Sequence, residues 1–504
     1  MFSVRRTAWL VGLGLTLLVG GTAGLAWLAL RETGGTWVYP LDDSYIHLSL
    51  ARELAARGHW GFGPTRTAFS SSSPGYTLLL ALGMRFSGPW AGWPLLLNSL
   101  GALALLAQSW RLWPHFSSKV PLWLLLHLLL PLPLLWLLGL EHLLHLGLML
   151  GLMQALSRLL SGQKPGHGWW LWAVGAALVR YETGFLIVVA GCWLMMKGRW
   201  RTAIPLGVAS LLPWLLVGAW SVSQGGTWLP LSVLLKGHPP GSLAWLGAAV
   251  QRLYDNPFML STLLALLLGL LPAARRHLSP AQEGPQRHWL ILTLFSGGLH
   301  LLFAEVGGYR YEAYWLGLAL MGLGHMIPPD WSWRRLSWPG AGLGLLLIFP
   351  LLIRSGFFLW HYPQATRNIY QQPYRAAQLL RAHYAGEPVG LNDIGLGTWL
   401  GQVELTDMVG VGDQAVFRLR QQDRFTAEAL DSLLRQRNVR LIVGHDIWLG
   451  SRMPARFRPV ARWKVPDNFI LADGELTFWV ADSATAARLE TALQQFNASL
   501  RNGP

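Results

Sequence analysis

Charged residues and cysteine are both scarce in this chain of 504 residues. Asp, Glu, Lys and Arg together make up 13% of the sequence, whereas hydrophobic residues make up 52%. Soluble domains carry about 25% charged residues, so these charges are too few to cover the roughly three soluble domains that this length would form. A soluble multidomain enzyme is therefore excluded, and the apolar content also excludes a disordered chain. The single cysteine, Cys192, excludes an intrachain disulfide framework without identifying the compartment.

Several motifs with known chemistry are also absent. The sequence has no His-Glu-x-x-His pair, no Walker loop, no dinucleotide-binding glycine loop and no Gly-x-Ser-x-Gly elbow. These absences argue against a histidine metal site and against direct nucleotide-powered transport. The net charge of +15 could indicate nucleic acid binding. Its distribution instead favours a membrane protein with basic cytoplasmic loops, so we expect no nucleic acid partner.

Apolar segments long enough to cross a bilayer fill residues 1–362. A transmembrane helix needs about 20 mostly apolar residues. The first such segment, Trp9–Leu30, resembles a signal peptide, but further apolar segments follow, so we interpret it as an uncleaved span. We predict about 11 to 13 spans in total. The number of crossings between Gly75 and Trp110 stays open, because Gly88-Pro89 interrupts that stretch.

Basic residues gather in a few loops and predict the orientation in a bacterial inner membrane. Arg5 and Arg6 place the N terminus in the cytoplasm, and five further basic clusters fit cytoplasmic loops. The polar loop 31–74 and the polar tail 363–504 then lie outside. The further clusters are Arg111 with Lys119, Arg158 with Lys164, Lys197 with Arg199 and Arg201, Arg275 with Arg276 and Arg287, and Arg334 with Arg335.

The tail, residues 363–504, has the pattern of a small soluble α/β domain. Short apolar runs predict strands, and an amphipathic stretch with an acidic start and a basic end predicts a helix. The fold class that we expect is thus mainly α, a polytopic helical bundle followed by this α/β domain. The predicted strands are Pro388–Asp393, Val439–Gly444 and Leu476–Ala481, and the predicted helices are Thr426–Arg437 and Ala484–Leu500.

An acidic pair, Asp42-Asp43, follows the first span by about ten residues. A carboxylate at the outer membrane face can act as a general base that accepts a proton from an attacking hydroxyl. Two carboxylates could instead hold a divalent cation such as Mg²⁺, Mn²⁺ or Ca²⁺. A solvated loop without function is the third interpretation, because Asp-Asp pairs are common.

The order of motifs around the acidic pair resembles the first outer loop of the GT-C superfamily of membrane glycosyltransferases. An amphipathic helical stretch, Leu48–Ala56, follows the pair; Gly61 and Gly63 come next, and Pro74-Gly75-Tyr76-Thr77 enters the next span. Within the superfamily the series is most similar to a bacterial branch that includes mycobacterial arabinofuranosyltransferases and mannosyltransferase-like enzymes. The resemblance implies a GT-C-like bundle and a polyprenyl-phosphate sugar as donor.

Further motifs match the same family in the same order, with departures. Arg180-Tyr181-Glu182 has tyrosine where the family element has proline, and Pro230-Leu231-Ser232, followed by Lys236, lacks the family's asparagine. Because of these departures, the resemblance predicts the enzyme class but not the substrate. Gly139-Leu140-Glu141 is similar to a Gly-Met-Glu element of the family, and the paired elements of its outer tail domain resemble Asn392-Asp393-Ile394-Gly395 and Asp407-Met408-Val409-Gly410.

The resemblance implies roles for individual residues. Asp42 is the expected base, and Asp43 is an alternative base, an acceptor contact or a metal ligand. Lys236, Arg310 and Arg180 are candidates for binding the donor phosphate, because cationic side chains neutralise it and a guanidinium can hold it bidentately. Each arginine could instead pair with the glutamate two residues on. The other candidate substrate-binding residues are Glu141, Glu182, His59 and Tyr76.

The sequence therefore predicts an integral membrane enzyme that transfers a sugar, with inversion, from a polyprenyl phosphate to an envelope glycan, lipid or protein. Its partners would be that donor, that acceptor and the bilayer, and no cofactor other than a divalent cation is expected. Two alternatives stay open. One is a polytopic transporter or flippase, which would have charged or broken helices near the bilayer midplane. The other is a noncatalytic subunit of an envelope-assembly complex.

Overall fold

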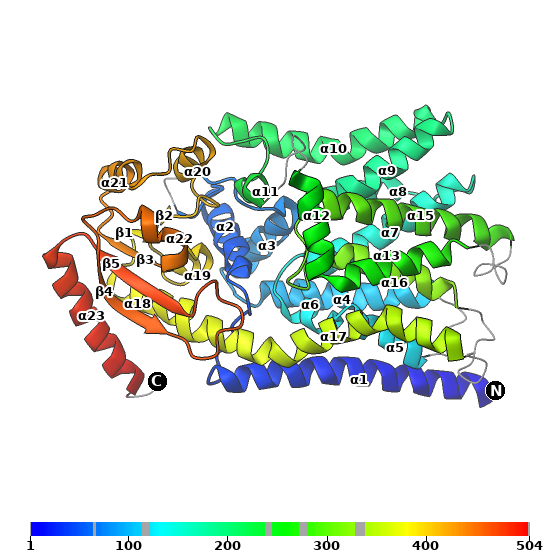
Figure 1. Ribbon diagram of the computed structural model, residues 1–504, viewed down its shortest axis with the longest axis horizontal. Helices are drawn as coiled ribbons and strands as arrows, with labels where there is room; N and C mark the ends of the chain where they lie inside the picture. The colour runs from blue at the N-terminus through cyan, green and yellow to red at the C-terminus, as the bar shows by residue number, and fades with distance from the viewer. Residues whose placement is uncertain are drawn as a thin grey trace.

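The computed structural model describes residues 2–63, 67–112, 120–236, 244–271, 280–327 and 338–501. Helices dominate this part of the chain and form an elongated bundle, with a small sheet domain at one end (Figure 1). The expected fold class, a mainly α membrane bundle followed by an α/β domain, is confirmed. Of the basic clusters, Lys119, Arg275, Arg276, Arg334 and Arg335 lie outside the described residues.

The bundle is built from helices whose boundaries follow the apolar runs of the sequence. Two of the helices, Trp169–Val179 and Thr183–Met196, coincide with apolar runs of the sequence. The bundle helices are α1 Phe2–Glu32, α3 Pro74–Ser87, α4 Trp93–Leu112, α5 Val120–Leu129, α6 Leu132–Leu137, α7 His142–Leu160, α8 Trp169–Val179, α9 Thr183–Met196, α10 Trp200–Ser223, α12 Ala244–Asp255, α13 Pro257–Gly269, α15 Pro280–Phe303, α16 Ala313–His325 and α17 Trp338–Ile369.

Proline and glycine break the apolar runs. The stretch from Gly75 to Trp110 is two helices, separated at Gly88, whose φ is 79°. The apolar run Val120–Leu138 is also not one helix. It is split between α5 and α6 at Pro131, which has no N–H to continue the hydrogen-bond ladder and has a φ of 21°.

Four of the described helices are long and apolar enough to cross a membrane. Many leucines of the bundle are exposed, as on α10, where Leu215 and Leu216 have exposed fractions of 55% and 62%. Such surfaces are stable next to lipid acyl chains, so the chain is a multi-pass membrane protein. The total of 11 to 13 spans stays a prediction. The four segments are Gly12–Glu32, His142–Leu160, Trp200–Ser223 and Gly344–His383.

The tail contains a five-stranded sheet with the order β2-β1-β3-β5-β4. β1 pairs in parallel with β2 and β3, and β5 pairs antiparallel with β3 and β4. The strands are β1 Pro388–Leu391, β2 Glu404–Asp407, β3 Leu441–Gly444, β4 Arg458–Lys464 and β5 Glu475–Val480. The helices are α18 Arg375–His383, α19 Ile394–Trp399, α20 Gln414–Gln421, α21 Ala427–Gln436, α22 Asp446–Leu449 and α23 Ser483–Arg501.

The first polar loop joins the two parts of the molecule. Helix α2 (Asp43–Arg57) and the short helix α11 (Leu231–Lys236) lie between the bundle and the tail (Figure 1). Leu50, Trp60 and Phe62 pack into the same apolar cluster as Leu391 and Ile394 of the tail. Helix α17 also runs into the tail through a π-helical turn, Tyr370–Tyr374, and α18. The loop therefore belongs to the tail's core while remaining in contact with the bundle.

Candidate active site

A cavity of about 370 Å³ lies where the first loop meets the bundle and the tail. It is bounded by α2, by the serines that precede α3, by the starts of α7 and α9, and by the turn before α16. Its polar lining consists of Asp43, His47, Ser70, Ser71, Ser72, Glu141, His142, Arg180, Tyr181, Glu182, Ser232, Glu305, Arg310 and Tyr311. Its apolar lining consists of Ile46, Leu140, Phe185, Trp214, Leu229, Val233, Phe303, Ala304 and Val411.

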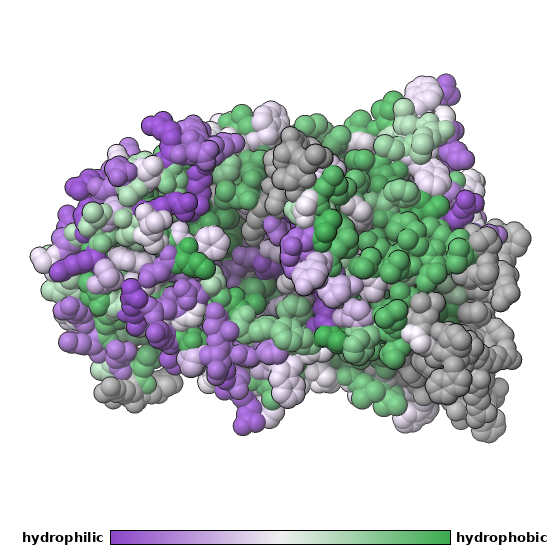
Figure 2. All heavy atoms as spheres, viewed as in Figure 1, coloured by the Kyte–Doolittle hydropathy of each residue, from purple (hydrophilic) through white to green (hydrophobic). Residues whose placement is uncertain are grey.

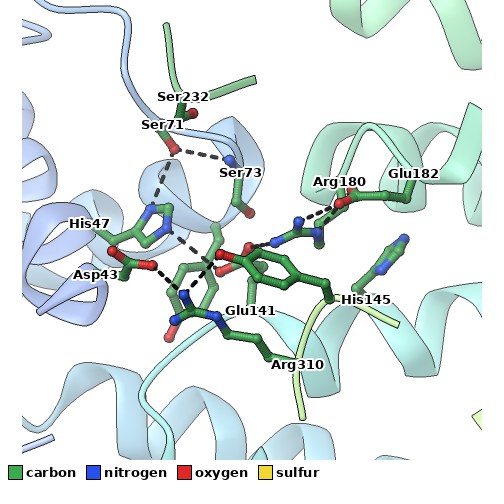
Figure 3. Close-up of polar contacts among 12 residues, drawn as sticks. Asp43, His47, Ser71, Ser73, Glu141, His145, Arg180, Glu182, Ser232 and Arg310 are labelled. Carbon is green, nitrogen blue, oxygen red and sulfur yellow. Dashed lines mark hydrogen bonds and ion pairs between the residues drawn. The ribbon is translucent and has the colours of Figure 1, made fainter. Parts of the chain in front are cut away.

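Asp43 and Arg310 form an ion pair at this cavity (Figure 3), with Nη2 of Arg310 lying 2.9 Å from Oδ2 of Asp43. The same Nη2 donates a hydrogen bond of 2.9 Å to the Tyr311 hydroxyl, and the guanidinium lies over the Tyr311 ring. Nη1 of Arg310 is buried and has no hydrogen-bond partner among the described residues. An unmade hydrogen bond of a buried charged group is costly, so this nitrogen is suited to an anion bound in the cavity.

A second charged cluster joins the starts of α7 and α9. Nε of Arg180 donates to Oε2 of Glu182 at 3.0 Å, and its terminal nitrogens donate to Glu182 and to Glu141. Glu141 is 1% exposed, and its Oε2 accepts no hydrogen bond from the part of the chain that the structure describes. The expectation that Arg180 pairs with the glutamate two residues on is thus realised, yet all three side chains also line the cavity.

His47 connects the serine loop with Glu141. Its Nδ1 lies 3.0 Å from the Thr77 hydroxyl and 3.4 Å from that of Ser71, while Nε2 lies 3.6 Å from Oε2 of Glu141 (Figure 3). Burial lowers the pKa of His47. A neutral His47 can donate one hydrogen bond and accept another, which suits it to contact sugar hydroxyls.

Asp42 points away from the cavity, although it is adjacent to Asp43. Its carboxylate accepts hydrogen bonds from the backbone N–H groups of Gly395 and Leu396, at 2.6 and 2.8 Å, at the start of α19. Burial and the negative charge of Asp393 raise the pKa of Asp42 to about 8, and the two backbone donors oppose this shift. Asp42 is not among the described residues that line the cavity.

The other predicted substrate-binding residues have different placements. Tyr76 is fully buried beneath the site, where its hydroxyl donates to the carbonyl of Gly139 at 3.4 Å. His59 is not part of the described lining, and its buried Nε2 has no hydrogen-bond partner within the described ranges. Lys236 ends α11, and its side chain lies outside the described part of the structure. Ser232, on the same helix, does line the cavity and donates to the carbonyl of Ser70 at 2.7 Å.

The described residues offer a poor fit for a dedicated metal site. Among them, no three His, Cys, Asp or Glu side chains lie close enough together to hold one ion. Asp43, the residue that we expected as a possible ligand, shares its carboxylate with Arg310. A divalent cation prefers six or more oxygen ligands, so we assign it no step in the reaction.

Several of these residues have only weak signals in the sequence. Asp43 and His47 are four residues apart on α2, a spacing that puts both on one helical face. The sequence alone does not single out His47, because a lone histidine is more often structural. Tyr311 and Trp214 carry no signal, since they reach the cavity only through the packing of the bundle.

Among known proteins, solved structures share the fold of this chain. A family model described as a domain of unknown function, DUF8728, matches residues 367–485 in the tail. No curated protein sequence matches the chain. The crystal structure of ArnT from Cupriavidus metallidurans bound to undecaprenyl phosphate is similar, with a TM-score of 0.55 and 12% identity, covering 94% of this chain and 98% of that chain.

The structure of the same ArnT in the apo state gives a TM-score of 0.52 and 14% identity, with 96% of this chain and 99% of that chain covered. At such identities the similarity defines the fold alone. Because nearly the whole of both chains is covered, the ArnT-like fold includes both the bundle and the tail.

Proposed function

We propose that this protein is a membrane glycosyltransferase of the GT-C type that takes its sugar from a polyprenyl phosphate. The observation that carries the proposal is the Asp43–Arg310 pair in the cavity, with Nη1 of Arg310 buried and without a partner in the described part of the chain. A base and a hydrogen-bond donor for a phosphate lie side by side there. The ArnT-like fold supports the proposal, because ArnT has been solved with undecaprenyl phosphate.

The lining of the cavity suits an amphipathic donor. Charged and hydroxyl side chains can hold the sugar and the phosphate, while Phe185, Trp214 and Phe303 offer apolar contacts to the first isoprene units. The apolar chain of such a lipid must stay out of water, and the apolar surface of the bundle gives it that environment. The indole of Trp214 stacks on Tyr181, with ring centroids 5.1 Å apart.

We assign the role of base to Asp43 and not to Asp42, which was expected to be the base. The carboxylate of Asp43 would accept the proton of an acceptor hydroxyl while the hydroxyl oxygen bonds to the anomeric carbon. The bond from that carbon to the phosphate oxygen breaks, and the phosphate leaves with the electron pair. Arg310 would stabilise the negative charge that develops on the phosphate, and a single displacement inverts the anomeric carbon.

In this proposal Glu141, Arg180 and Glu182 bind the substrate together with His47. Lys236 stays a candidate for the phosphate, whereas Tyr76 supports the site from below and His59 does not contact the substrate.

Residues 1–362 form the catalytic part, residues 363–504 form an extracytoplasmic domain, and the chain lies in the bacterial inner membrane. The acceptor is an envelope glycan, lipid or protein, and a transporter or a noncatalytic subunit is the alternative.

The experiment that tests the proposal is a transfer assay with the purified full-length protein in detergent. Radiolabelled polyprenyl-phosphate sugars are offered with an envelope extract as acceptor, and the label is followed from donor to acceptor. We expect label to move from one donor with the wild type and not with Asp43→Asn. Consumption of no donor would favour a noncatalytic or transport role, and equal turnover by Asp43→Asn would refute the assigned base.

A further inference from the structure

A second cavity, of about 720 Å³, lies on the tail side of the first loop. It is larger and more polar than the candidate active site, and it shares no described lining residue with that site. It is bounded by the end of α2, by the loop that follows it and by the tail segments before and after β2. Its described lining contains none of the residues expected to be catalytic or to bind the substrate.

Two short segments separate this second cavity from the candidate active site. Ala68 and Gly412 line the second cavity. Their near neighbours Ser70 and Val411 line the candidate active site. The backbone N–H of Gly412 donates to the Asp407 carboxylate at 2.5 Å. A molecule that occupied both cavities would therefore have to cross a wall only a few residues thick.

The charges that line the second cavity are largely paired with one another. Nη2 of Arg52 lies 3.2 Å from the Glu53 carboxylate, which also pairs with Arg57. Arg437 forms two hydrogen bonds with Asp413, one of them 3.1 Å long. Because these arginines already have carboxylate partners, the described lining offers little for a phosphate and disfavours an anionic ligand.

In the remaining polar lining Glu404 is the charged residue, so the three arginines of the described lining are matched by three carboxylates, those of Glu53, Glu404 and Asp413. Gln224, Gln402 and Gln414 line the cavity, and each carries a side-chain amide. Amides, and arginines paired with carboxylates, can donate and accept hydrogen bonds in fixed planes. This geometry suits the neighbouring hydroxyl groups of a sugar. Together these groups have the chemistry of a binding site for a neutral saccharide.

We infer that the second cavity binds a neutral saccharide chain that serves as the acceptor, and that the end of this chain crosses the wall at residues 68–70 and 411–412 to reach Asp43. The inference rests on the proposed function, because it identifies the acceptor of that reaction as a glycan and not as a lipid or a protein. A lipid acceptor would need an apolar groove continuous with the bundle surface, and the described lining of this cavity includes several charged residues and three glutamine amides. The position of the cavity, beyond the loop that carries Asp43, suits a water-soluble chain that approaches from the tail side.

The inference is tested by saccharide binding to the full-length protein in nanodiscs. The probe is the pool of neutral oligosaccharides released from the envelope of the native cells, and saturation-transfer NMR detects the bound molecules. Ala56→Trp and Gln414→Trp fill the cavity from its two sides, and both positions are partly or fully exposed, so folding is retained. Gln422→Trp, at the exposed end of α20 and outside the lining, is the matched control.

We expect the saturation transfer to fall by at least about fivefold in both filled variants and to be unchanged in the control. Asp43→Asn should still bind the saccharide, and excess undecaprenyl phosphate should not displace it. Absence of binding by the wild type, wild-type binding by both filled variants, or displacement by undecaprenyl phosphate would each overturn the inference. Saccharide binding at this cavity without any transfer activity would refute the proposed function and the acceptor role, and would leave the cavity as a saccharide-binding site.

Discussion

Asp42 and Asp43 are adjacent, yet their surroundings give them different tasks. At the start of α2 the two side chains diverge, so Asp43 faces Arg310 in the cavity while Asp42 contacts the first turn of α19 in the tail. A base must reach the proton that it removes, either directly or through one water. Of the two, Asp43 alone lines the space in which a substrate could bind. Asp42 is better suited to hold the first loop against the tail.

Replacing Asp43 by Asn should abolish transfer while leaving donor binding intact. An amide cannot accept the proton, and a positioned general base contributes about 10²- to 10⁴-fold to the rate. We therefore expect kcat to fall by about that factor, with the Kd for undecaprenyl phosphate changed little. The transfer assay and a lipid-binding assay on the same preparation measure the two quantities. An intact kcat would show that another group removes the proton.

Replacing Arg310 by Gln should weaken binding of the donor phosphate. Hydrogen bonds to charged groups contribute about 1.5–3 kcal/mol, which corresponds to about 10- to 100-fold in Kd. Titration of the purified protein with undecaprenyl phosphate measures the change, and Arg31→Gln, an exposed arginine outside the cavity, is the control. An unchanged Kd would contradict the role of Arg310 and would indicate that Arg180 or Lys236 binds the phosphate instead.

Most of the charged residues of the site could be predicted from the sequence, but their partners could not. The motif order pointed to Asp43, Glu141, Arg180 and Glu182, and the chemistry of a guanidinium pointed to Arg310. All five line one cavity. The choice between the two aspartates could not be made from sequence. It depends on a contact between residue 42 and residue 395, which are far apart in the chain and are brought together only by docking of the tail.

At the scale of secondary structure, α19 links the tail to the first loop. The carboxylate of Asp42 accepts from the N–H groups of its second and third residues, and the Ser49 hydroxyl donates to the carbonyl of Gly395 at 3.3 Å. A Cβ atom on residue 395 would lie only 2.2 Å from the Asp42 carbonyl oxygen. The fit is close enough that only glycine is accommodated at this position.

The docking of α19 should weaken as the pH rises. The pKa of Asp42 is about 8 in the folded protein, against 3.8 for the unfolded chain, so its ionisation lowers the stability of the folded state. The stabilisation is complete below about pH 4 and is lost as the pH rises through about 8. Removing the charge of a neighbour, with Asp393→Asn, lowers this pKa and makes the loss smaller.

Deuterium uptake by the peptide that covers α19 measures this effect, after correction for the intrinsic exchange rate at about pH 6 and about pH 9. The matched control is Asp423→Asn, which removes the charge of an exposed tail carboxylate that is not among the groups shifting the pKa of Asp42. It should retain the wild-type pH dependence. Equal protection of α19 at both pH values in the wild type would contradict the raised pKa of Asp42.

Helices of the bundle were easier to predict than strands of the tail. An apolar run bounded by polar or glycine residues specifies a membrane helix, as with α8 and α9. By contrast, β4 is largely exposed and basic, and β2 is short, so neither has the apolar signal of a buried strand. Their pairing is decided by neighbours in the sheet, which a local pattern cannot show.

At the scale of the whole molecule, the hydropathy of the surface differs between the bundle and the tail. Hydrophobic residues cover much of the bundle, and hydrophilic residues gather on the tail (Figure 2). The candidate active site and the second cavity both lie near the junction of these two regions, where the first loop packs with the tail. A donor with a lipid chain and an acceptor from water could meet at such a junction, which agrees with the proposed function.

The orientation in the membrane follows from the basic loops and can be measured directly. If the N terminus is cytoplasmic, the loop after α7 is also cytoplasmic and the tail is extracytoplasmic. Cys192 is the only cysteine, so Cys192→Ser gives a background without thiols. In that background Gln422→Cys in the tail should react with a membrane-impermeant maleimide in intact spheroplasts. Lys164→Cys, which is also exposed, should react only after permeabilisation. The opposite pattern would place the candidate active site on the cytoplasmic side, where its acceptor could not be an extracytoplasmic glycan.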